Sequence, residues 1–121
     1  MSDNQNGKQY DLEERTYEFA KAVALFCKKL SKNLSNISYI KQVIRSSSSI
    51  GANYIEANES LGKKDFMMRI KICRKEAKET AYWLKLIIET NPPEFSKEGK
   101  ELYDESIELK KIYSSILEKA K

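Results

Sequence analysis

The segment from Lys63 to Thr90 constrains the fold more than any other part of this chain. It contains neither proline nor glycine, so nothing in it interrupts a long helix. With about 100° between successive residues of a helix, its side chains separate into three faces. One face is an apolar strip suited to a core, made of Phe66, Ile70, Cys73, Ala77, Thr80, Ala81, Leu84 and Ile88.

The second face of this segment is also apolar and is centred on Trp83. It is either the edge of a wide core or a contact between subunits, where aromatic residues and methionine are enriched. A helix with two separate apolar strips has more surface to bury than one small bundle covers, which favours a homo-oligomer. The small residues of the serine-rich stretch at 45–53, which precedes this segment, offer a second place where helices can approach closely. The expected interface residues are Ser48, Gly51, Met68, Ile72, Trp83 and Leu86.

The third face is a row of lysines, made of Lys64, Lys71, Lys75, Lys78 and Lys85. The chain has a net charge of +4, and residues 63–90 carry all of that excess. Such a row is either a solvated face or a site that attracts the phosphates of RNA or DNA without reading their sequence. Tyr82 lies between the lysines and is either a stacking partner for an exposed base or a partly buried side chain.

Hydrophobic spacing predicts three more helices, at 11–32, 36–60 and 94–120, with the lysine-bearing helix ending near Asn91 before two prolines. The serine-rich stretch at 45–53 has poor helix propensity, but the apolar residues around it keep a helical phase, which favours helix. Short connectors predict an all-α, antiparallel, up-down-up-down four-helix bundle over residues 11–121. Residues 1–10 are polar and are expected to form a disordered tail.

The composition argues against an enzyme. The chain of 121 residues has no histidine, which excludes Ser-His-Asp and Cys-His catalytic groups. It has no glycine-rich phosphate motif, and we expect no cofactor. Cys27 and Cys73 lie on apolar helix faces and are expected to be free buried thiols. No run is apolar enough for a membrane span, and no secretory signal is evident, so we expect a cytoplasmic protein.

Several acidic and basic side chains have spacings that suggest contacts between helices. Carboxylates three residues apart lie side by side on a helix, which suits either a metal site or structural ion pairs. Without histidine a metal site would need oxygen ligands alone, so ion pairs that hold the helices in register are favoured and no metal is expected. The expected pairing residues are Arg45, Glu56, Arg74, Glu76 and Glu79.

Three stretches resemble a known family when taken together. They are LEERTYEFA at 12–20, RSSSSIGANYIEANES at 45–60 and KKDFMMRIKICRKEAKETAYWLKL at 63–86. The chain resembles the small four-helix-bundle proteins encoded within intervening sequences of bacterial large-subunit ribosomal RNA genes. That resemblance implies a homopentamer with no known catalytic activity. An accessory protein of diversity-generating retroelements, similar in fold, is a basic pentamer that binds nucleic acid and a reverse transcriptase.

Two functions are compatible with these sequence features. The first is a non-enzymatic oligomer that binds RNA or DNA weakly through the lysine row. The second is a scaffold that docks another protein without nucleic acid. Salt-dependent binding of nucleic acid would distinguish the first from the second.

Overall fold

The computed structural model describes residues 11–121, and the expected tail at 1–10 lies outside them. This part of the chain is all-helical, as predicted, and contains no strand. Its helices are α2 (Leu12–Cys27), α3 (Leu34–Asn58), α4 (Lys63–Glu89) and α5 (Ser96–Ala120), with a short 3-10 helix, η1 (Pro93–Phe95), before α5. None of these helices is both long and apolar enough to cross a membrane.

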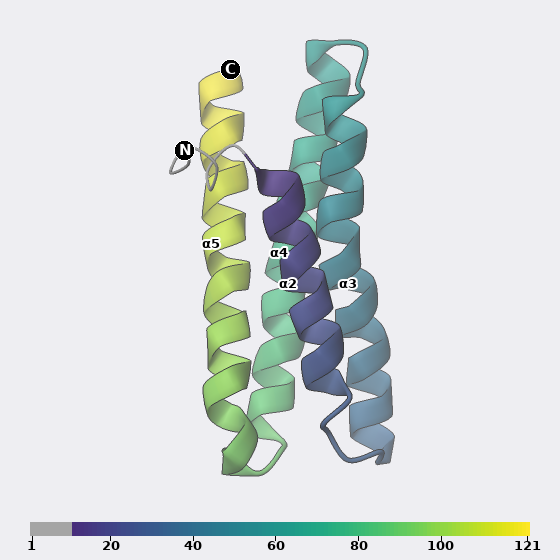
Figure 1. The fold of residues 1–121 in the computed structure, drawn as a ribbon. Helices are drawn as coiled ribbons and strands as arrows, with labels where there is room; N and C mark the ends of the chain where they lie inside the picture. The colour runs from purple at the N-terminus through teal and green to yellow at the C-terminus, as the bar shows by residue number, and fades with distance from the viewer. Residues whose placement is uncertain (1–10) are drawn as a thin grey trace.

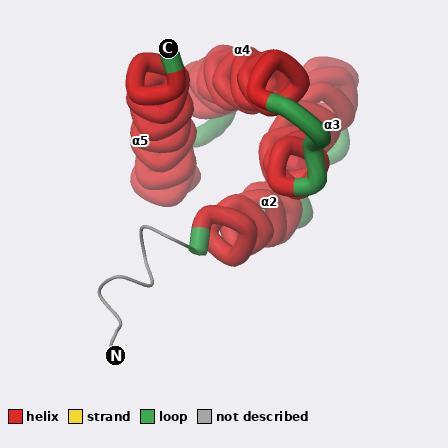
Figure 2. Tube along the Cα trace, turned by 90° about the horizontal axis from the view of Figure 1, so that it is seen from above, coloured by secondary structure: helices red, strands yellow, loops and turns green. Residues whose placement is uncertain are grey.

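The helices follow one another around the bundle in chain order (Figure 2), and their connectors lie at alternating ends (Figure 1). Helix α4 packs extensively against both α3 and α5. By contrast, α2 packs much less closely against α5. Arg15 of α2 makes two hydrogen bonds to Glu105, at 2.7 and 2.9 Å, and Lys29, in the connector after α2, contacts Glu98 at 2.8 Å.

Polar side chains set the helix starts. The carboxylate of Asp11 accepts a hydrogen bond from the Glu14 amide at 3.2 Å, and Asn33 accepts one from the Asn36 amide at 2.9 Å. The second helix therefore begins at Leu34, two residues before the predicted start. The first helix ends at Cys27 rather than near Lys32, because the amide of Lys29 bonds back only three residues and tightens the final turn.

The serine-rich stretch is helical, as the phase of its apolar neighbours predicted. Its hydroxyls bond to carbonyls of the preceding turn, as Ser49 does to Arg45 at 2.7 Å. Ser46 and Ser47 are buried, and the Ser46 hydroxyl accepts a hydrogen bond from Thr80 of α4 at 2.8 Å. Small side chains at these positions let α4 approach α3 closely.

The core draws large apolar side chains from all four helices. Most of the predicted core strip of α4 is buried, but Phe66 and Ile88 are only half-buried while Ile87 is fully buried. The buried arc of α4 is shifted because this helix packs between two neighbours rather than against one face. The largest fully buried apolar side chains are Val23, Phe26, Val43, Ile50, Ile70, Leu84, Ile87, Leu109 and Tyr113.

Gly51 gives a first test of this packing. A Cβ at this position would lie 2.7 Å from Oγ1 of Thr16 on α2, and that hydroxyl is already held by the Leu12 carbonyl at 2.8 Å. We expect Gly51→Leu to lower the free energy of unfolding by about 1 kcal/mol or more, because overpacking outweighs the gain in helix propensity. Urea denaturation of the purified protein measures this change.

The matched control is Ala52→Leu, at the exposed neighbouring position. That substitution should alter the free energy of unfolding by no more than about 0.5 kcal/mol. Equal effects of the two substitutions would contradict the close contact between α2 and α3.

The two thiols give a second test. Cys27 and Cys73 are both buried and free, and Cys73 donates to the Ile50 carbonyl at 3.4 Å. Burial raises the pKa of Cys27 to about 11 and that of Cys73 to about 12. Both should therefore stay protonated near neutral pH and react with a thiol-specific dye only after unfolding. Rapid labelling of either cysteine in the native protein would show that its surroundings are open.

Candidate nucleic-acid interface

The lysine row predicted from the sequence lies along the exposed side of α4. Lys64, Lys71, Lys75, Lys78 and Lys85 are all exposed. None of the five is within ion-pair distance of a carboxylate belonging to residues 11–121. Their ammonium groups therefore remain without a direct carboxylate partner within this part of the chain.

The structure gathers three of these lysines around one hollow between α4 and α5, with a volume of about 450 Å³. Five cationic side chains and one hydroxyl line this basic groove, and no carboxylate does. The lining residues are Lys71, Arg74, Lys75, Lys78, Lys110 and Ser114.

Two members of the basic groove were not assigned to it from the sequence. Arg74 was expected in an ion pair, and Lys110 was not singled out. The sequence does show that the second half of α5 is basic. That pattern points to Lys110 only once α5 is known to lie beside the middle of α4. Cationic side chains contributed by two helices focus a positive potential on the hollow between them. Such a site suits a phosphate-bearing polymer.

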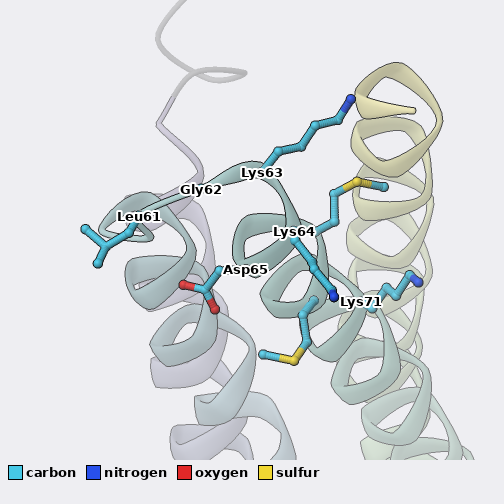
Figure 3. Close-up of a pocket in the computed structure, with 8 residues that line it drawn as sticks. Leu61, Gly62, Lys63, Lys64, Asp65 and Lys71 are labelled. Carbon is cyan, nitrogen blue, oxygen red and sulfur yellow. The ribbon is translucent and has the colours of Figure 1, made fainter.

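Lys64 and Lys85 lie outside the basic groove. Lys64 shares a second hollow with Lys71, of about 860 Å³, at the connector between α3 and α4 (Figure 3). In that view, Lys63 and Lys71 project toward α5, whereas Leu61 points the opposite way and is fully exposed. The remaining lining residues of this hollow are Gly62, Asp65, Met67 and Met68.

On the α3 side of α4, Arg45 makes a cluster with two carboxylates. Its guanidinium lies 3.3 Å from Glu76, which is buried, and also pairs with Glu79. Glu79 accepts a further hydrogen bond from the indole N–H of Trp83 at 3.0 Å. That indole bond, with the Arg45 contact, holds the pKa of Glu79 below its usual value, although partial burial opposes the shift.

The expected ion pairs of Glu56 and Arg74 are not formed among residues 11–121. Glu56 is exposed on α3, and α4 directs Arg74 toward α5 and the basic groove, away from α3. Arg69 occupies the contact with α3 instead, donating to the Asn53 side-chain oxygen at 3.1 Å. Within the described residues, no three Cys, Asp or Glu side chains gather as a metal site.

The second apolar strip of α4 is not part of the fully buried core. Met68 is exposed, while Ile72, Trp83 and Leu86 are half-buried. Trp83 packs against Tyr39 of α3, with ring centroids 6.2 Å apart. The other expected interface residues differ from each other: Ser48 is exposed, but Gly51 faces Thr16 within its own chain.

Comparison with known proteins agrees with the fold and with the resemblance. The model of the 23S rRNA-intervening sequence protein family matches residues 8–115. A crystal structure of a protein of unknown function from the S23 ribosomal protein family of Bacteroides thetaiotaomicron is similar. It has 33% sequence identity and a TM-score of 0.75, and the match covers 87% of this chain and 96% of that one. No curated protein sequence matches. Since the family model spans most of its length, this chain belongs to the 23S rRNA-intervening sequence protein family.

Proposed function

We propose that this protein is a non-enzymatic helical-bundle protein that binds RNA or DNA through the basic groove between α4 and α5. The observation that carries the proposal is the lining of that groove, which has five cationic side chains and no carboxylate. Three of these cations come from the exposed lysine row and have no carboxylate partner within residues 11–121. A set of close positive charges without partners is costly to keep together, and bound phosphates relieve that cost.

Binding of this kind depends on the phosphate backbone and carries little sequence information. The affinity should fall steeply as salt rises, because each neutralised phosphate releases counterions. If all five cations of the groove contact phosphates, the slope of log affinity against log salt would be about −3.5 to −4.5.

A double charge reversal tests the groove. We expect Lys71→Glu with Lys78→Glu to abolish measurable binding, because two phosphate contacts are lost and two repulsive charges replace them. Fluorescence anisotropy with a labelled oligonucleotide, repeated over a series of salt concentrations, measures both the affinity and the slope.

The control is Lys41→Glu with Lys97→Glu, which makes the same change in net charge at two exposed positions outside the groove. This pair should retain most of the binding and most of the salt slope. If both pairs weaken binding equally, the protein binds through its overall charge and the groove has no special part.

We further propose that the subunit is an antiparallel bundle. It assembles into a homo-oligomer through the second apolar strip of α4, and the family resemblance implies five copies. Alternating connectors support the topology, and the exposed or half-buried apolar residues of the strip support the interface. In a ring of subunits, the electrostatic fields of the basic grooves would add. Simultaneous contacts by several copies would strengthen the weak binding of each one.

Met68 provides the cleanest test of this interface, because it is 51% exposed and lies outside the core. Met68→Asp should reduce the mass measured by light scattering with little change in the thermal unfolding of the subunit. The matched control is Leu25→Asp on α2, at a residue with the same 51% exposure. An unchanged large mass for Met68→Asp, or a monomeric wild-type protein, would rule out assembly through this strip.

A scaffold that docks another protein is the second candidate. The fully exposed Leu61 and the exposed Met68 around the hollow at the α3–α4 connector favour it, since exposed apolar side chains often mark protein contacts. Absence of oligonucleotide binding at low salt, together with a partner retained after nuclease treatment, would favour the scaffold over the nucleic-acid function.

A further inference from the structure

We infer that the nucleic acid taken by the basic groove is single-stranded, and that Tyr82 stacks on one of its bases. This inference rests on the proposed function, because it names the class of nucleic acid held by the same face. Two sources share the required chemistry, single-stranded RNA and single-stranded DNA, and the experiment below includes both.

The first supporting observation is the position of Tyr82 among the lysines. It follows Lys78 by four residues and precedes Lys85 by three, so all three share one side of α4. The rise of the helix places Tyr82 about 6 Å along the axis from Lys78. A base on the tyrosine ring would therefore have cations on both sides for its flanking phosphates.

The second observation is exposure. Tyr82 is 60% exposed, whereas Tyr39, Tyr54, Tyr103 and Tyr113 are half-buried or buried. The ring consequently offers surface to a ligand and is not the partly buried side chain that was the other interpretation of the sequence. An exposed aromatic ring within a positively charged surface is the arrangement used by proteins that bind single strands.

The third observation is the support behind the ring. Tyr82 lies against Trp83, with centroids 5.0 Å apart and planes at 76°, and Trp83 lies against Tyr39. The Trp83 indole is in turn held by its hydrogen bond to Glu79. A ring that is braced in this way loses little side-chain entropy when a base stacks on it.

Unpaired bases are required because stacking needs a free base face. In a duplex the base faces are covered by neighbouring base pairs, and an aromatic residue on a convex helix surface reaches only the backbone and groove edges. In a single strand each base can turn outward and stack on an aromatic side chain, whatever its identity. The lysines would bind both forms, but Tyr82 adds affinity only for the single strand.

Labelled oligothymidylate, oligouridylate and a DNA duplex, each on the order of 20 nucleotides long, test the inference by fluorescence anisotropy against the full-length protein. We expect Tyr82→Ala to weaken binding of both single strands about 5-fold or more, while leaving duplex binding nearly unchanged. Tyr82→Trp should retain single-strand binding, because it keeps an aromatic surface. A loss for only one of the two single strands would assign the site to RNA or to DNA.

The matched control is Tyr17→Ala, because Tyr17 is 62% exposed but lies on α2, away from the lysine row. It should leave all affinities unchanged. The salt series adds a second readout. Tyr82→Ala should lower single-strand affinity by a similar factor at every salt concentration and leave the slope of log affinity against log salt unchanged, because it removes no phosphate contact.

The results separate this inference from the proposed function. If the wild-type protein binds no strand at low salt, the proposed function and the stacking role of Tyr82 are both refuted. If it binds and the Lys71→Glu with Lys78→Glu variant does not, while Tyr82→Ala binds single strands as well as wild type, only the stacking role falls. Equal losses for single strands and duplex in Tyr82→Ala would also overturn the preference for unpaired bases.

Discussion

The close contact between α3 and α4 is the constraint on which the rest of the structure depends. Small buried side chains make it possible, with the Ser46 hydroxyl bonded to Thr80 across the contact. At the edge of the same contact, Arg45 pairs with Glu76 and Glu79 and holds the two helices in register. Once this side of α4 is covered by α3, the orientation of every other side chain on α4 is determined by the helical repeat.

This orientation explains how one helix has three separate roles. Its buried arc faces the core, its polar and aromatic edge meets α3, and its lysines remain in solvent beside α5. Glu79 links these regions, since it binds both Arg45 and the Trp83 indole, and Trp83 in turn supports Tyr82. The contacts of Glu79 and Trp83 therefore support the Tyr82 ring, whose place among the lysines is given by the helical repeat.

Much of this architecture could be predicted from local patterns. The all-helical fold, the helical serine-rich stretch and the burial of both cysteines follow from the spacing of apolar residues. Helix ends were less certain: α2 stops five residues before the predicted end, because a tightened final turn competes with the helix there. Arg74 forms no ion pair among residues 11–121 for a different reason, since periodicity places a residue on a face but does not say which neighbouring helix that face meets.

The sequence by itself determined that the excess positive charge lies on one helix, because that follows from the order of residues and the angle between them. It also determined that this helix carries a second apolar strip besides the one that suits the core. Only the tertiary structure decided that Arg74 and Lys110 join the lysines around one groove, and that Tyr82 is exposed while Trp83 packs on Tyr39. The physical reason is that such contacts join residues far apart in the chain, and their geometry is set by how whole helices pack against one another.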